Sequence, residues 1–209
     1  MPTVRRLPAY LRLLRDSREG GQQYVSSTYI AERLQLEPIQ VRKDLAGMGI
    51  IGQPRLGFVV NDLIDAIVNF LGWNTTADAF IVGAGNLGSA LAGYSGFADY
   101  GLNIVAAFDR DEKKIGTRIH GKKVYPMGRL SGLARRMHVH IAILTLTAAD
   151  AQSTADRLVE VGIRAIWNFT PVKLVVPESI IVEKVDLAAS LAVFSRSLRE
   201  KIIGVREVS

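Results

Sequence analysis

The chain has 209 residues, a formal net charge of +6 and no cysteine. The missing cysteine excludes disulfides, thiolate zinc sites and cysteine nucleophiles. No apolar run approaches the ~18–20 residues of a membrane span, and the start lacks the apolar stretch of a signal peptide. We therefore expect a cytoplasmic protein without a membrane partner. Residues 1–61 carry a balance of +4 and the remainder +2, which makes the N-terminal third the basic part and fits a polyanion partner.

The first ~72 residues predict a small helical unit. Leucines at helical spacing indicate a first helix that Gly20-Gly21 ends. Ser26 or Ser27 is placed to cap a second short helix. Pro38 suits the first position of a third helix, whose buried stripe would be Val41, Leu45 and Met48.

Residues 50–60 predict two short apolar strands around a Gly/Pro turn, which form a hairpin, or wing. Asn61 or Asp62 would cap a further helix that ends at Gly72, and residues 73–76 form the linker. Two short helices followed by a wing predict a winged helix-turn-helix DNA-binding domain over residues 1–76. Its candidate DNA contacts point away from the buried stripe or lie in the wing, and they are Gln40, Arg42, Lys43 and Arg55. The alternative is a solvated polar helix face.

Residues 80–109 carry the most specific motif of the chain. An apolar strand runs into the cofactor candidates Gly83, Ala84, Gly85, Asn86, Leu87 and Gly88, a helix follows, and a second strand ends in Asp109. This context is the one that a dinucleotide site requires. The glycines allow a tight turn, an approach of backbone N–H groups to the pyrophosphate and close helix packing, while Asp109 would accept from the ribose hydroxyls. Arg110 is a complication, because an adjacent arginine can hold a 2′-phosphate.

Residues 77–185 alternate strands and helices, which predicts a parallel Rossmann-like sheet domain. We expect strands at 79–82, 103–108, 139–145, 163–168 and 180–185 and helices at 86–96, 129–137 and 148–161, the last with a capping box of Thr147 and Asp150. Residues at strand ends are further candidates for the cofactor pocket; these are the polar Thr145, Thr147 and Asn168, and Phe169 beside them. Ordinary turn chemistry would explain the same residues.

The final segment, residues 186–209, begins with a helix to about residue 202. Its apolar residues Leu187, Leu191, Phe194 and Leu198 repeat at near-heptad spacing. This face is the candidate dimer contact. The alternative is a helix that packs on the core of its own domain.

Several stretches resemble the Rex family of redox-sensing transcriptional repressors over nearly the whole chain. The most specific are the run from Gln40 to Leu45 and the glycine motif; residues 25–27, 108–109, 114–116, 167–171 and 185–187 also match. The resemblance implies an α/β protein with a winged-helix N-terminal domain, a Rossmann domain and a C-terminal dimerisation helix that swaps across a homodimer. It further implies double-stranded DNA as partner, through palindromic operators, and release from them when NADH accumulates relative to NAD.

The resemblance also implies roles for individual residues. Arg42 and Lys43, together with the matching serines Ser26 and Ser27, would contact DNA, and Tyr94 would lie near the nicotinamide. Arg12 would link the DNA-binding domain to the C-terminal helix through Asp186. The wing (residues 52–58) and the stretch before it (residues 47–51) depart from the family pattern, which leaves the operator sequence and affinity open.

The competing interpretations are an NAD-dependent oxidoreductase and a nucleotide-binding oligomeric subunit. A dehydrogenase needs a substrate domain and a proton donor near the nicotinamide. Only a helix follows the dinucleotide fold, and His138 and His140 precede the cofactor end of their strand. We therefore expect a regulator without catalytic residues and without a metal.

Overall fold

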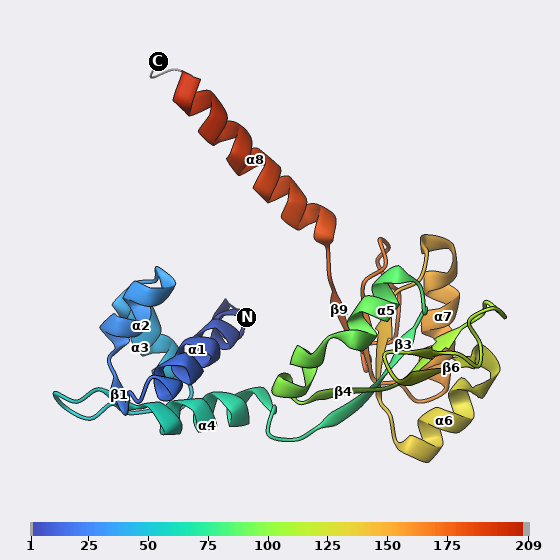
Figure 1. The fold of residues 1–209 in the computed structure, drawn as a ribbon, viewed down its shortest axis with the longest axis horizontal. Helices are drawn as coiled ribbons and strands as arrows, with labels where there is room; N and C mark the ends of the chain where they lie inside the picture. The colour runs from blue at the N-terminus through green and yellow to red at the C-terminus, as the bar shows by residue number, and fades with distance from the viewer. Residues whose placement is uncertain (1, 207–209) are drawn as a thin grey trace. The chain divides into compact units, whose positions relative to one another are not determined.

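The computed structural model of the protein describes residues 2–206 and divides the chain into two compact units, Met1–Thr76 and Ala77–Ser209. The first unit contains α1 (Pro2–Glu19), β1 (Tyr24–Val25), α2 (Ser27–Leu34), α3 (Pro38–Ala46), β2 (Phe58–Val59) and α4 (Val60–Leu71). Its core is formed by apolar residues of all four helices, and Leu7, Leu11, Leu14, Ile30, Val41, Leu45, Leu63 and Ile67 are fully buried. The expected helical stripes are therefore the ones that build this core. The four helices α1 to α4 form most of this unit (Figure 1).

The helix ends follow local chemistry in most places. Ser26 caps α2, since its hydroxyl accepts from the backbone N–H of Tyr29. Pro38 opens α3 as expected, and Gly72 closes α4 in the left-handed conformation. The expected Asn61 or Asp62 cap of α4 is wrong, because the helix already begins at Val60 and no side chain bonds to its first turn.

The wing differs from the expected hairpin. Residues 50–51 form no strand, and β2 pairs antiparallel with β1 instead. Residues 53–57, directly before β2, form a tight loop that the Gln53–Gly57 bridge closes. Gly57 adopts φ +91° and lies so close to the Val25 carbonyl oxygen that a Cβ there would overlap it. The wing is thus joined to β1 through the β1–β2 pairing, with Gly57 packed closely against Val25, and not to a strand at residues 50–51.

The second unit is built on a seven-stranded sheet. Its strands are β3 (Ala77–Val82), β4 (Leu102–Asp109), β5 (Arg118–Ile119), β6 (Lys122–Pro126), β7 (Ile141–Leu144), β8 (Ala165–Asn168) and β9 (Ile181–Lys184). The order is β5-β6-β4-β3-β7-β8-β9, and only the β5–β6 pair is antiparallel. Without the β5 edge, this is the Rossmann order, in which ligands bind where the order reverses between β3 and β7.

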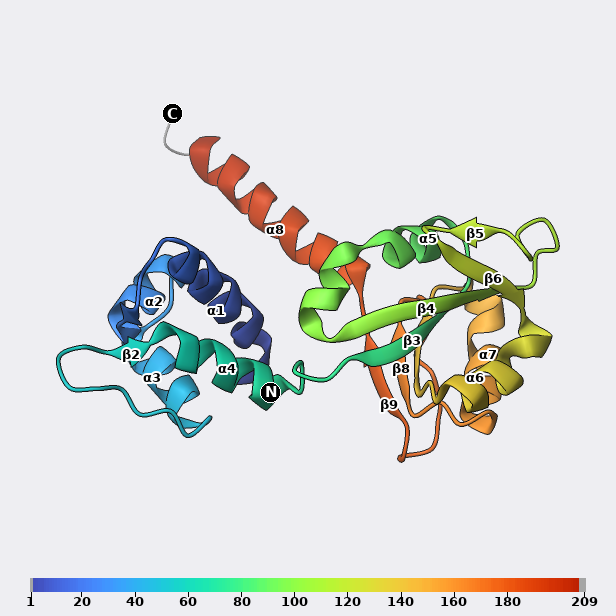
Figure 2. The ribbon, with the colours of Figure 1, turned by 60° about the horizontal axis from the view of Figure 1, so that its bottom comes forward.

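Helices cover both faces of this sheet (Figure 2). Helices α6 (Leu130–Met137) and α7 (Ala148–Glu160) pack on the face that carries Phe80, Val82 and Phe108. Helix α5 (Asn86–Gly93) and the 3-10 segment η1 (Ser95–Tyr100) pack on the face of Ala79 and Ile81. One strand can serve both faces because successive side chains of a strand point to opposite sides of the sheet.

Several elements of the second unit differ from those expected from the sequence. The expected helix over residues 86–96 ends at Gly93 and is followed by η1, and neither the β5–β6 hairpin nor the 3-10 turn η2 (Met127–Arg129) was expected. His138 and His140 lie before β7, which begins at Ile141. Helix α8 (Leu187–Arg206) follows β9. No helix within residues 2–206 is long and apolar enough to cross a bilayer.

Candidate functional site

The glycine turn after β3 has one position that is open and two that the fold itself requires. Gly83 adopts φ +108°, and a Cβ there would lie 2.7 Å from the Thr145 carbonyl oxygen. A Cβ on Gly88 would overlap the Gly83 carbonyl oxygen. In contrast, a Cβ on Gly85 would meet nothing within 4 Å. Gly83 and Gly88 therefore permit the turn, while Gly85 leaves its backbone open to a ligand.

Helix α5 begins directly at this opening. Gly85 is its N-cap residue and no side chain bonds to the first turn. The first N–H groups of the helix, beginning at Asn86, therefore lack a side-chain cap, and they lie at the positive end of the helix dipole. Leu87 on this turn is partly exposed and Ala84 is buried. An open glycine before an uncapped helix fits the pyrophosphate of a dinucleotide.

Asp109 ends β4 and is tied to the glycine turn. Its carboxylate accepts from the backbone N–H of Ala84 at 2.8 Å and of Asp111 at 2.9 Å. Lys114 Nζ lies 3.3 Å from the same carboxylate. Burial alone would raise the pKa of Asp109, but these donors and the Lys114 charge outweigh burial and lower it. The structure thus places an ionised carboxylate beside the turn.

Arg110 points to a carboxylate of the chain. Its guanidinium Nη1 lies 2.6 Å from Asp150 Oδ1 in the first turn of α7. Asp150 also accepts from the Thr147 hydroxyl at 3.0 Å. The expected capping box is therefore wrong in its bonding, because Thr147 makes no side-chain bond to the helix backbone.

The strand-end candidates are bonded within the protein. The Thr145 hydroxyl donates to the Gly83 carbonyl at 2.8 Å, which braces the glycine turn. Asn168 is fully buried; its amide donates to the Val172 carbonyl and its oxygen accepts from Thr170. The bonds of the Asn168 side chain thus agree with the alternative interpretation, in which this residue stabilises the turn after the strand.

Tyr94 is exposed and lies at one end of a row of aromatic rings. Its ring meets Phe97 edge-on at 4.9 Å, Phe97 meets Trp167 at 5.6 Å, and Trp167 meets Phe169 at 5.1 Å. Phe97 and Trp167 were missed as neighbours of the site. Phe169 thus belongs to the cluster of rings behind Tyr94, and the edge-to-face contact of Phe97 orients the Tyr94 ring.

In the first unit, α3 presents Arg42 and Lys43 to solvent, while Val41 and Leu45 are buried. Gln40 was expected on the same outward face. Its amide instead donates to Asp44 Oδ1 at 3.0 Å. The free cations of this helix are therefore Arg42 and Lys43, and Gln40 is turned toward the α1 side.

Asp44 was missed by the sequence analysis, although it is the common acceptor of a hydrogen-bond network in the first unit. It is 2 % exposed, and it accepts from four residues. Arg6 contacts it through two nitrogens at 2.7 Å each, Tyr10 OH lies 2.8 Å away and Thr3 Oγ1 3.0 Å away, and Gln40 adds the fourth. Burial raises the pKa of Asp44, but these bonds reverse the shift and lower the pKa to about 2.

The other DNA candidates fall into two groups. Ser26 is an exposed cap, whereas Ser27 is buried in α2. Arg55 lies exposed at the tip of the wing, where it adopts a left-handed φ of +65°.

Helix α8 leaves its apolar face uncovered. Every side chain from residue 186 to residue 202 is exposed, and Leu187, Leu191 and Phe194 are each more than 60 % exposed. The alternative that α8 packs on the core of its own domain is therefore wrong. Asp186 caps the helix, because it accepts from the Ala189 N–H at 3.0 Å, and its pKa is lowered by that bond and by Lys184. Arg12 is exposed on α1.

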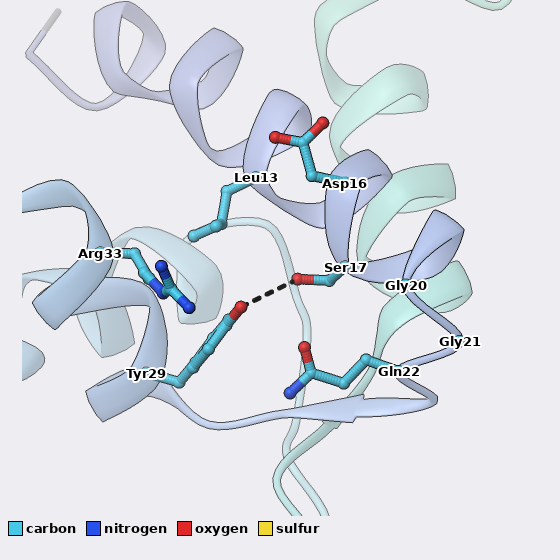
Figure 3. A pocket seen from close by; sticks show the side chains of 8 residues that line it. All are labelled: Leu13, Asp16, Ser17, Gly20, Gly21, Gln22, Tyr29 and Arg33. Carbon is cyan, nitrogen blue, oxygen red and sulfur yellow. Dashed lines mark hydrogen bonds between the residues drawn. The ribbon is translucent and has the colours of Figure 1, made fainter.

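A polar hollow in the first unit lies outside all of these candidates (Figure 3). It is lined by the end of α1, the following turn and α2. The Ser17 and Tyr29 hydroxyls meet at 3.4 Å within it, and the Arg33 guanidinium lies 5.5 Å from the centre of the Tyr29 ring. The hollow contains none of the residues expected to contact DNA or cofactor.

Two family models match separate parts of the chain. One, described as the N-terminus of a putative DNA-binding protein, matches residues 1–46, and one described as a CoA binding domain matches residues 74–172. The redox-sensing transcriptional repressor Rex of Treponema denticola is 48% identical over 96% of this chain and 95% of its own length. Its counterpart in Carboxydothermus hydrogenoformans is 42% identical over 94% and 95%.

Solved structures agree with the sequence relatives. RSP in complex with β-NAD+ and operator DNA has a TM-score of 0.91, 36% identity, and coverage of 99% of this chain and 95% of that one. RSP in complex with β-NADH has a TM-score of 0.87, 34% identity, and coverage of 100% and 98%. Fold, glycine turn and identity along almost the whole length therefore agree, and this chain belongs to the Rex family of redox-sensing transcriptional repressors.

Proposed function

We propose that this protein is a DNA-binding transcriptional repressor that senses the ratio of NADH to NAD, and that NADH releases it from its operator. One observation carries the proposal: a single chain combines an open glycine turn at the reversal point of a Rossmann sheet with a separate unit whose third helix exposes two cations. The RSP complexes with NAD+ plus operator DNA and with NADH support this pairing of ligands.

In this proposal each domain has its own function. Residues 1–76 hold DNA, residues 77–185 hold the cofactor, and residues 186–209 join two copies into a homodimer. When NADH or NAD is bound, it supplies a nicotinamide whose redox state differs between the two forms. The chain holds the pyrophosphate at Gly85 and the first turn of α5, and it holds the ribose beside Asp109. Tyr94, Thr147 and Phe169 remain candidates for the nicotinamide half, and Arg12 and Asp186 for the link between domains.

The decisive experiment measures DNA release. An operator is first selected from random double-stranded DNA with the full-length protein, and binding is followed by fluorescence anisotropy. NADH titrated into the NAD-loaded complex should release the DNA, while coenzyme A, which shares the adenosine and pyrophosphate, should not. Turnover of NADH with small carbonyl compounds would favour the oxidoreductase instead, and failure to select any DNA sequence would contradict the repressor.

We predict that the protein binds NADH at least about tenfold more tightly than NADPH, which corresponds to ~1.4 kcal/mol. The ionised Asp109 would face a 2′-phosphate across a short distance, and like charges repel. Arg110 already pairs with Asp150. Arg110→Ala should therefore leave the ratio of the two affinities unchanged. Calorimetry with both cofactors measures the ratio, and equal affinities would contradict the assignment of Asp109.

We predict that Arg42 and Lys43 carry operator binding. Arg42→Ala should cost roughly 1–3 kcal/mol if the guanidinium pairs with guanine. Lys43→Ala should weaken binding, and it should lower the salt slope by about one if the ammonium group neutralises a phosphate. Arg18→Ala, an exposed cation at the end of α1, is the matched control and should bind like the wild type. Unchanged affinity in both α3 variants would remove this helix from the interface.

A further inference from the structure

The outward face of α3 contains more than its two cations. Ile39, Arg42, Lys43 and Ala46 are all exposed, and at 100° per residue they fall within one stripe about 100° wide. Val41, Asp44 and Leu45 occupy the buried side. Since Gln40 is bonded to Asp44, the face offered to a partner consists of two cations between two apolar side chains.

Ile39 is the unusual member of this face. It is 59 % exposed, although burial of an isoleucine is favourable, and it directly follows Pro38 in the first turn of the helix. The first turn of a recognition helix is the part that meets base edges in the major groove. Isoleucine is stiff at χ1 in a helix, so its methyl groups are presented in one arrangement rather than many.

The chemistry of the major groove limits what such a side chain can recognise. Guanine, cytosine and adenine offer hydrogen-bonding groups there, and only thymine adds an apolar group, its C5-methyl. An isoleucine has no donor or acceptor on its side chain. Arg42 and Lys43 pair with guanine acceptors and phosphates, so neither recognises a methyl group.

We propose that Ile39 reads the C5-methyl group of a thymine in each operator half-site. The inference rests on the proposed function, because it needs α3 to lie in the major groove. It adds a specificity determinant that acts through apolar contact, next to the polar contacts of Arg42 and Lys43. Ile39 is thereby a residue that selects the operator sequence, beyond attraction to the DNA backbone.

The test removes the methyl group from the DNA rather than from the protein alone. In the operator selected by the wild-type protein, each thymine is replaced by uracil, which keeps the base pair and deletes only the methyl. Each half-site should contain one thymine whose replacement by uracil weakens wild-type binding about fourfold, when only that half-site is changed. This factor is the equivalent of ~0.8 kcal/mol for one buried methyl group. Replacement in both half-sites should weaken binding roughly 15-fold.

The protein variants then assign the effect. Ile39→Ala should bind the thymine and uracil operators equally, and Ile39→Val should keep part of the difference. Ile181→Ala, at an exposed isoleucine of the second unit, is the control and should remain as sensitive to uracil as the wild type. Far-ultraviolet circular dichroism confirms that each variant is folded.

Two results would overturn the proposal. Either no thymine of the operator responds to uracil, or Ile39→Ala responds as strongly as the wild type. Both leave operator binding itself intact, so they are distinguishable from a failure of the repressor function, in which the protein selects no DNA sequence.

Discussion

Asp44→Asn should destabilise the N-terminal unit by roughly 3 kcal/mol at neutral pH, because breaking one partner of a buried ion pair costs about that much. The carboxylate is the common acceptor for Arg6, Tyr10, Thr3 and Gln40. An amide keeps the shape but loses the charge and half of the acceptor capacity. The Arg6 guanidinium would then lie against a neutral group. The variant should also bind the operator more weakly, since this carboxylate fixes α3 to α1.

The pH dependence of the unfolding free energy tests the same prediction, and its direction follows from the lowered pKa of Asp44. The folded pKa of Asp44 is lowered to about 2 from an ordinary value of 3.8. A lowered carboxyl pKa contributes stability that is fully present above the unfolded pKa and is lost as the pH falls toward the folded one. The stability difference between wild type and Asp44→Asn should therefore be constant above about pH 5 and shrink between about pH 4 and pH 2.

The chain offers a direct reporter for this experiment. Its two tryptophans fall in different units, and Trp73 packs against the core of the first. Urea unfolding followed by Trp73 fluorescence in a Trp167→Phe background isolates that unit. Asp65→Asn, an exposed carboxylate on α4, is the matched control and should unfold like the wild type. Equal urea midpoints for Asp44→Asn and wild type at pH 7 would contradict the prediction.

Asp44 also illustrates what the sequence alone could not predict, which is the identity of the partners of its carboxylate. It stands beside Lys43 in a charged run, so composition alone places it on the solvated face. Three positions after the buried Val41, it faces inward, and three of its four partners lie 34 to 41 residues away on α1. The helical period could have placed the carboxylate inside, but only the fold brings the donors to it.

The same distinction holds for the second unit. The glycine motif and the alternation of apolar strands predicted the parallel sheet, because these signals are local and strong. The β5–β6 hairpin was missed, since its strands are short and begin with charged residues. Its signal was the turn His120-Gly121, where both residues adopt positive φ, the pattern of a two-residue hairpin loop. The role of Thr145 depended on its long-range bond to Gly83 and could not be read from the strand end alone. The Asn168 side chain bonds Thr170 and Val172, which are close in sequence, so ordinary turn chemistry already covered it.

Helix α8 carries the prediction with the largest effect on assembly. Leu187, Leu191, Phe194, Leu198 and Ile202 fall within a stripe about 80° wide at 100° per residue, and each is 48–64 % exposed. Fully burying one such side chain contributes about 1.5–3 kcal/mol. Five of them on each of two copies would outweigh the several kcal/mol that association costs. In the single chain this apolar face is exposed to water, and a homodimer would bury it.

We therefore predict that the protein is a homodimer and that deletion of residues 186–209 yields a folded monomer that still binds NADH. The side chains of residues 186–202 are all exposed, so their removal takes nothing from the sheet core. Leu187→Asp, at the start of the helix, should leave NADH binding measurable but uncouple it from DNA release, because a ligand alters DNA binding only by favouring one dimer arrangement.

Point variants on the two sides of α8 separate the apolar stripe from the helix as a whole. Leu191→Asp combined with Phe194→Asp places two charges in the stripe and should give a monomer in sedimentation velocity. Val193→Asp is the matched control: it is 69 % exposed but lies well outside the stripe at helical spacing, so its dimer should persist. Operator affinity should fall with the dimer, since a palindrome needs two recognition helices about one DNA turn apart. A truncated protein that still sediments as a dimer would place the contact elsewhere in the chain.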